Sequence, residues 1–148
     1  MVTPFVIDTN LYVYAEREPE VRDALRGFLR DQSARVVVST VVLHELLVGA
    51  AEKKAHAAIE RAVLTPFARR LRLLETSAVV WQEAATITRA LRADGGYAGS
   101  LAAPSFHRDI LIAASVRSVG ATLVTTNARD FETIAKVYGF RYTTHFPE

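Results

Sequence analysis

Short apolar segments that alternate with longer helical stretches constrain the fold of this chain more than any other feature of its sequence. The run from Val36 to Val38 is β-branched, which is typical of a strand. Short strands separated by helices indicate a parallel sheet covered by helices, so the predicted fold class is α/β. The predicted strands are Phe5–Ile7, Arg35–Ser39, Arg72–Leu74, Thr122–Thr125 and Phe140–Tyr142.

Helices are predicted between these strands. Ser77 is a suitable N-cap for the longest helix, and Gly95 and Gly96 are suited to end it. The segment Gly95–Pro104 is rich in glycine and is predicted to be a loop. The predicted helices are Leu11–Ala15, Pro19–Arg30, Val41–Ala51, Lys53–Leu64, Ser77–Ala93, Ser105–Val119 and a helix that Asn127 caps and that runs to about Val137.

The composition narrows the class of protein. A chain of 148 residues, 50% of them hydrophobic and 23% charged, suits one compact domain, which we expect to span residues 1–148. The absence of cysteine excludes disulfides and thiolate zinc sites. The N-terminus lacks the pattern of a signal peptide, and no apolar run approaches the ~20 residues that cross a bilayer. We therefore expect a cytoplasmic protein without a membrane anchor, whose net charge of +2 permits nucleic-acid binding.

Acidic and amide side chains follow several predicted strands. Asp8 comes directly after the first strand, and Glu45 lies one turn into the helix after the second. Asp109 lies in the first turns of the helix that begins near Ser105, and Asn127 and Asp130 follow the fourth strand. Because ligands of parallel sheets bind beyond the carboxyl ends of the strands, we expect these oxygen ligands to meet at one edge.

The surroundings of these acids point to a metal ion. Glu45 lies in an apolar helix, and Asp109 precedes the apolar run Ile110–Ala114. A lone buried charge is costly, and gathered carboxylates repel one another. A divalent cation resolves that repulsion, and carboxylates without cysteine suit Mg²⁺ or Mn²⁺ better than zinc.

Each acid also has a structural interpretation, and the sequence leaves these alternatives open. Asp8 could cap the helix that begins near Leu11. Glu45 could pair with an arginine or reach solvent, and Asp109 could complement a helix dipole. Asp130, three residues after Asn127, could assist capping there.

Four segments together resemble the PIN-domain family, in particular its VapC-type toxins of VapBC toxin–antitoxin systems. They are Val6–Asn10 (VIDTN), Ser39–Ala50 (STVVLHELLVGA), Asp109–Ala114 (DILIAA) and Gly120–Phe131 (GATLVTTNARDF). The resemblance implies a three-layer α/β/α fold with four or five parallel strands and an acidic pocket for Mg²⁺ or Mn²⁺.

The resemblance also assigns roles to particular residues. Asp8, Glu45 and Asp109 match the family's first three acids and would bind the metal. Asn127 stands at the fourth position, which is often aspartate, and the nearby Asp130 could complete the site. Thr9 and Thr126 match small polar positions near the pocket, where a plain structural role is the alternative.

The implied activity is that of a hydrolase and nuclease: an endoribonuclease that hydrolyses RNA phosphodiester bonds with a metal-activated water. Arg108 and Arg129, each beside a motif residue, could contact phosphates or could simply be surface arginines. Tyr97 could stack on a base, or its loop could be only a mobile connection. His107 could aid proton transfer or be a surface histidine. The implied partners are an RNA substrate, a cognate VapB-like antitoxin and a second copy of the chain in a homodimer.

Other functions are weighed against this one. The metalloprotease motif H-E-x-x-H fails because Val48 stands where its second histidine belongs. A haloacid-dehalogenase-type phosphatase would carry a second aspartate where Asn10 stands. A PIN-like module that binds RNA or a partner without cleavage, and a PIN nuclease of RNA maturation, remain alternatives.

Overall fold

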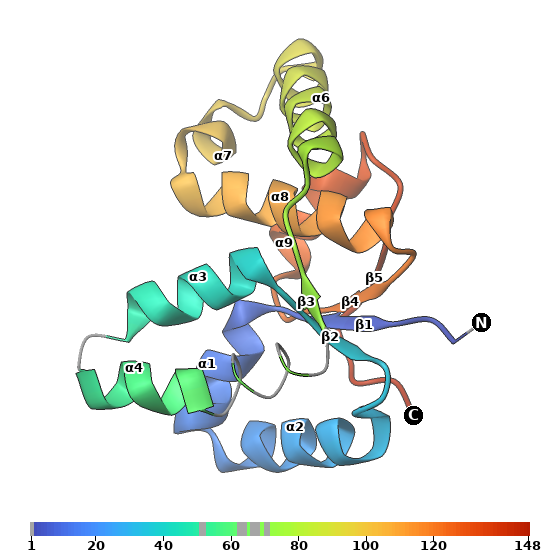
Figure 1. Ribbon diagram of the computed structural model, residues 1–148. Coiled ribbons are helices and arrows are strands. Elements are labelled where there is room, and N and C mark those ends of the chain that lie inside the picture. Colours follow the sequence, from blue (N-terminus) through green and yellow to red (C-terminus); the bar gives the residue numbers. More distant parts are fainter. Residues whose placement is uncertain (1, 51–52, 62–64, 66–68, 70–71) are drawn as a thin grey trace.

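A parallel sheet lies at the centre of the protein (Figure 1). The computed structural model describes residues 2–50, 53–61, 65, 69 and 72–148, and within them the sheet has five strands in the order β3-β2-β1-β4-β5. Every pairing in the sheet is parallel, which confirms the predicted fold class. The strands are β1 (Phe5–Ile7), β2 (Val36–Ser39), β3 (Leu73–Leu74), β4 (Thr122–Val124) and β5 (Arg141–Thr143).

The strand order places β1 in the middle of the sheet, with Val6 opposite Val37 of β2 and Leu123 of β4. From β1 the chain builds the sheet outward through β2 and β3, and then crosses to the other side of β1 to add β4 and β5. The order therefore reverses between β1 and β4. In open parallel sheets, the carboxyl ends of the strands at such a reversal form a crevice that binds ligands.

Helices cover both faces of the sheet, which gives the three layers expected (Figure 1). On one face, α1 and α2 pack over Phe5 and Ile7. On the other face, α3, α6, α8 and α9 pack over Val6 and Leu123. The alternation of Phe5, Val6 and Ile7 between the two cores follows from the two-residue period of a strand. The helices are α1 (Thr9–Arg17), α2 (Pro19–Gln32), α3 (Thr40–Gly49), α4 (Lys53–Ile59), α6 (Ala78–Asp94), α7 (Ala98–Ala102), α8 (Pro104–Ser118) and α9 (Ala128–Ala135).

Most predicted elements are confirmed with ends shifted by one or two residues, and Ser77 caps α6 as predicted. The prediction that Gly95–Pro104 is a loop is wrong, because Ala98–Ala102 forms α7. Tyr97 and Leu101 pack against the main core, so tertiary contacts stabilise a helical turn that the local glycines disfavour. The last helix ends at Ala135, short of the predicted end. The predicted helical residues 51 and 62–64 lie outside the described residues.

In the part of the chain that the structure describes, no helix combines the length and the apolar character that crossing a membrane requires.

Candidate active site

Asp8 lies between β1 and α1, and each oxygen of its carboxylate accepts a hydrogen bond. Its Oδ1 accepts a hydrogen bond from the Thr9 backbone N at 2.8 Å, so Asp8 is the N-cap of α1. Its Oδ2 accepts a hydrogen bond from Thr125 Oγ1 at 2.6 Å. The side chain is only 3% exposed. The capping role considered from the sequence is therefore present, and it fixes the direction in which the carboxylate points.

Thr125 is a site residue that the sequence reasoning missed. It follows the last residue of β4 and is fully buried, and its Oγ1 also accepts a hydrogen bond from the Asn127 backbone N at 3.0 Å. Thr126, the residue predicted instead, is exposed and makes no side-chain hydrogen bond to the acids within the described residues. Alternation along β4 could not have singled out Thr125, because helices cover both faces of the sheet and residues that point to either face are buried.

Glu45 reaches the same edge of the sheet from α3. Thr9 Oγ1 donates a hydrogen bond to Glu45 Oε1 at 3.1 Å, which gives Thr9 a place in the site. Arg108 Nε lies 3.3 Å from Glu45 Oε2, so the alternative that Glu45 pairs with an arginine is realised. This Nε is buried and has no well-aligned hydrogen bond among the described residues. The pair joins α3 to α8 directly beside Asp109.

Asn127 connects the two remaining acids. Its Nδ2 donates hydrogen bonds to Asp109 Oδ2 at 3.2 Å and to Asp130 Oδ2 at 3.1 Å. Its Oδ1 accepts a hydrogen bond from the Asp130 backbone N at 3.5 Å, so Asn127, as predicted, is the N-cap of α9. Asp130 therefore assists the capping by Asn127, as the structural interpretation held. Its side chain also shares the Asn127 amide with Asp109, and this connects α8 to α9 at the site.

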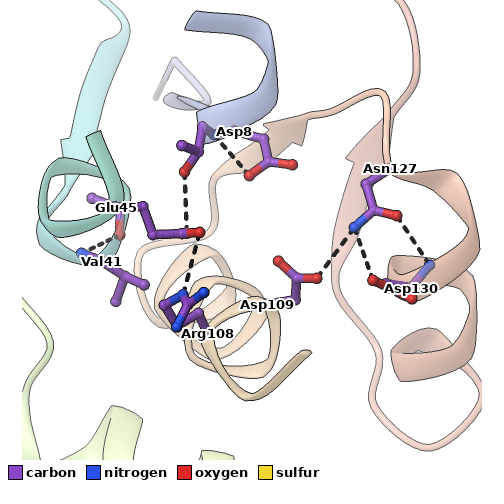
Figure 2. A network of polar contacts seen from close by, with 9 residues as sticks. Asp8, Val41, Glu45, Arg108, Asp109, Asn127 and Asp130 are labelled. Carbon is purple, nitrogen blue, oxygen red and sulfur yellow. Dashed lines mark hydrogen bonds and ion pairs between the residues drawn. The ribbon is translucent and has the colours of Figure 1, made fainter. Parts of the chain in front are cut away.

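Figure 2 shows Asp8, Glu45, Asp109 and Asn127 directed toward a common space from four different parts of the chain. Asp130 lies below Asn127 in the same view and is joined to it by hydrogen bonds. Within residues 2–50, 53–61, 65, 69 and 72–148, no three acidic or histidine side chains are close enough to hold one ion without rearrangement. The predicted residues are thus gathered around one hollow, but they are not yet arranged as the ligands of a single ion.

Burial and mutual repulsion dominate the electrostatics of these acids. Burial above all, and then the charges of Asp8, Asp130 and Glu45, raise the pKa of Asp109 to about 9. Burial also raises the pKa of Asp8 to about 6, although the hydrogen bonds from Thr125 and Thr9 lower it. Such carboxylates repel one another when they are all ionised, and a hard divalent cation relieves that repulsion. The donor set of carboxylate and amide oxygens therefore fits Mg²⁺ or Mn²⁺.

Other residues singled out in the sequence lie in different surroundings. Arg129 is exposed on α9, and within the described residues its side chain forms no hydrogen bond or ion pair. His107 Nε2 lies 2.6 Å from the Leu101 carbonyl oxygen, so its ring ties α8 to α7. The ring of Tyr97 packs against the core, with Lys136 Nζ 5.7 Å from its centroid. The side chains of His107 and Tyr97 therefore contribute to the packing of helices.

Comparison with known proteins gives the same family that the motifs indicate. A tRNA(fMet)-specific endonuclease VapC of Shigella flexneri is 31% identical over 130 residues, which cover 88% of this chain and 91% of that protein. A protein of the same name from Salmonella typhimurium is also 31% identical, over 131 residues and the same shares of both chains. The solved structure of DNA-bound VapBC from Salmonella typhimurium superposes with a TM-score of 0.70 and 26% identity, covering 96% of this chain and 98% of that one.

The resemblance to VapC-type proteins is therefore confirmed. The model of the PIN domain family matches residues 5–137. This range includes the four acids of the site and the amide between two of them: Asp8, Glu45, Asp109, Asn127 and Asp130. On this match and these relatives, the chain belongs to the PIN-domain family.

Proposed function

We propose that the protein is a Mg²⁺- or Mn²⁺-dependent endoribonuclease, the toxin of a VapBC-type toxin–antitoxin pair, with residues 1–148 as a single PIN domain. The observation that carries the proposal is the gathering of buried Asp8 and Asp109 with Glu45 at the reversal point of the sheet. Relatives that cover most of the chain are named as endonucleases that act on tRNA(fMet), which supports RNA as the substrate class.

Asp8, Asp109 and Glu45 would hold the ion, with the Asn127 amide and Asp130 at the edge of the same hollow. When bound, the ion supplies a Lewis acid that stabilises charge on the phosphate and acidifies a water molecule. Its binding requires the carboxylates to turn toward one another. Glu45 is the one best placed to turn, because its carboxylate is 20% exposed whereas Asp8 is fixed by two hydrogen bonds.

The reaction adds water across an RNA phosphodiester. The water oxygen bonds to phosphorus, the bond from phosphorus to one ribose oxygen breaks, and that oxygen takes up a proton. Thr125 holds the Asp8 carboxylate in place, and Thr9 hydrogen-bonds to the Glu45 carboxylate beside it. The Asn127 amide, which can both donate and accept, orients a water or a phosphate oxygen. Arg108 offers a guanidinium to the substrate phosphates.

Binding partners are proposed from the relatives. One of the solved relatives is a DNA-bound VapBC structure, and we propose that a VapB-like antitoxin also binds this chain. The acidic hollow is complementary to a basic side chain of such a partner. A homodimer, a cytoplasmic location and phosphate contacts by Arg129 stay predictions, as does a role for Thr126.

The test is an in vitro cleavage assay on total RNA, followed by sequencing of the RNA ends. We expect cleavage in Mg²⁺ or Mn²⁺, none in EDTA, and a loss of at least about 100-fold for Asp8→Asn and Asp109→Asn, because ligand loss removes the stabilisation of the transition state. Lys136→Ala, on the surface away from the acids, is the matched control and should cleave normally. Cleavage that persists in both aspartate variants would show that other residues carry the reaction.

A second candidate function is a PIN-like module that binds RNA or a protein without cutting. It is favoured by the amide at Asn127 and by the absence, among the described residues, of three acids close enough to share an ion. Binding of RNA by the purified protein without metal-dependent cleavage would establish this alternative.

A nuclease of RNA maturation is a further alternative. It would be favoured if the protein cleaves RNA but its expression does not arrest cell growth.

A further inference from the structure

A hollow of about 390 Å³ lies next to the acidic site, on the other side of Arg108. Arg108 lines it, while the Nε of the same side chain lies beside Glu45. Val41, one helical turn before Glu45 on α3, lines it as well (Figure 2). The acidic site and this hollow, which we call the Trp81 hollow, therefore share a wall. A chain that binds at the acids therefore passes close to the hollow where it runs along Arg108.

The Trp81 hollow takes its name from the indole that α6 contributes. Trp81 lies in the first turn of α6 and is 57% exposed, whereas its neighbour Val80 is buried in the core. Val79 is just as exposed, at 58%, but it lies two positions away and hence on another side of the helix. It does not line the hollow. Trp81 therefore combines an exposed indole with a place in the lining of the hollow.

The remaining lining combines an apolar surface with hydrogen-bonding groups at its edge. Val41 is buried beneath the hollow, and the hydroxyls of Thr40 and Thr76 lie 3.1 Å apart beside it. The imidazole of His44 is exposed and can donate or accept a hydrogen bond. A flat aromatic ligand with polar groups on its rim matches this lining, and a nucleobase has this chemistry. The volume lies within the ~300–1,000 Å³ of small-molecule sites.

We propose that the Trp81 hollow binds the base of a nucleotide next to the scissile phosphate of single-stranded RNA. Trp81 stacks on the base, Thr40, Thr76 and His44 contact its polar edge, and Arg108 contacts the phosphate between base and acids. This proposal rests on the proposed ribonuclease function and adds the part of the site that selects unpaired RNA. An arginine between an aromatic face and an acidic hollow suits a phosphodiester chain, which alternates flat bases with anionic groups.

The experiment uses the full chain in EDTA with a single-stranded 2′-O-methyl RNA oligonucleotide, so that no cleavage is needed. Trp81 is the only tryptophan of the sequence, so its emission reports on this hollow alone. We expect the oligonucleotide to quench the emission and the same sequence in a duplex to leave it unchanged. Fluorescence anisotropy of a labelled oligonucleotide should show binding weakened by about 5- to 150-fold in Trp81→Ala, since base stacking on an aromatic residue contributes about 1–3 kcal/mol.

Two further variants make the outcome decisive. Trp81→Phe keeps an aromatic face and should bind within about threefold of the wild type, which also covers the case that Trp81→Ala folds poorly. Val79→Ala removes an equally exposed apolar side chain of the same helix turn and should bind like the wild type. Unchanged binding in Trp81→Ala, no quenching at saturation, or no binding by the wild type at ~100 µM would each overturn the proposal.

A second copy of the chain is the competing occupant. If the emission changes with protein concentration alone, and Trp81→Ala turns a dimer into a monomer in sedimentation, the hollow is a protein interface and the proposal is overturned. The test is separate from that of the ribonuclease function. If the wild type binds RNA through Trp81 but does not cleave it, only the proposed ribonuclease function is refuted. If the Trp81→Ala variant cleaves RNA as well as the wild type does, only the proposed base site is refuted.

Discussion

The hydroxyl of Thr125, together with the capping bond from the Thr9 backbone N, fixes the orientation of the Asp8 carboxylate. This hydroxyl donates to the carboxylate of Asp8 and accepts from the backbone N of Asn127, so it links the ends of β1 and β4 on opposite sides of the strand-order reversal. The acids of this site thus depend on neutral neighbours for their orientation. The two raised pKa values show the cost of gathering them, because the charged forms are disfavoured by burial.

The variant Thr125→Val tests this dependence, because it keeps the shape of the side chain and removes the hydroxyl. We expect a loss of about 1–3 kcal/mol in the free energy of unfolding, since a buried carboxylate oxygen and a backbone N lose their partner. The pKa of Asp8 should rise further, because the lost hydrogen bond lowers it in the wild type. Chemical denaturation and carboxyl NMR titration measure the two effects. Thr126→Val, on the exposed side, is the control, and an equal effect there would contradict the assignment.

The ion-free protein should become more stable when Asp109 is replaced by asparagine. The pKa of Asp109 is about 9 in the folded state against 3.8 ordinarily, so between these values the native state holds a proton that the unfolded state has released. The free energy of unfolding of the wild type therefore falls as pH rises through this range. In EDTA, the free energy of unfolding of Asp109→Asn should exceed that of the wild type. The difference should grow from pH 5 to pH 8, to the order of 1–3 kcal/mol. Thermal melts measure this difference, and a difference that stays constant with pH would contradict the raised pKa.

At the scale of elements, sequence patterns correctly predicted those strands and helix ends that depend on interactions between neighbouring residues. The strand β2 follows from its β-branched run, and α6 begins at Ser77 because that hydroxyl accepts from the Val80 backbone N. The segment from Gly95 could not be predicted in this way. The positive φ of Gly95 and Gly96 ends α6 as expected, but α7 depends on packing of Leu101 against distant parts of the chain. No window of neighbouring residues contains that information.

The candidate site shows the same division. Asp8 and Asp109 could be found from the sequence because an acid beside an apolar run is unusual and the motifs mark it. The pairing of Glu45 with Arg108 was left as one of several alternatives, because it joins α3 to α8 across a long stretch of sequence. Thr125 was missed, since its importance arises only from the pairing of β4 with β1.

At the scale of the whole molecule, an ion in the acidic hollow should stabilise the fold. We expect millimolar Mn²⁺ to raise the melting temperature of the wild type by several degrees, since a ligand that binds only the native state adds to its stability. Mn²⁺ should have a much smaller effect on Asp109→Asn, which has lost a ligand and the repulsion that the ion relieves. Differential scanning calorimetry with and without Mn²⁺ measures both shifts. An equal shift in the two proteins would locate the ion elsewhere.

The central position of β1 has a consequence for synthesis on the ribosome. Translation makes β1 before β4, although the two are neighbours in the sheet and Phe5 lies opposite Thr122. A nascent chain therefore carries Asp8 through 117 further residues of elongation before it gains Thr125, which hydrogen-bonds to its carboxylate. We expect the proposed nuclease activity to appear only after β4 has left the ribosomal tunnel and paired with β1.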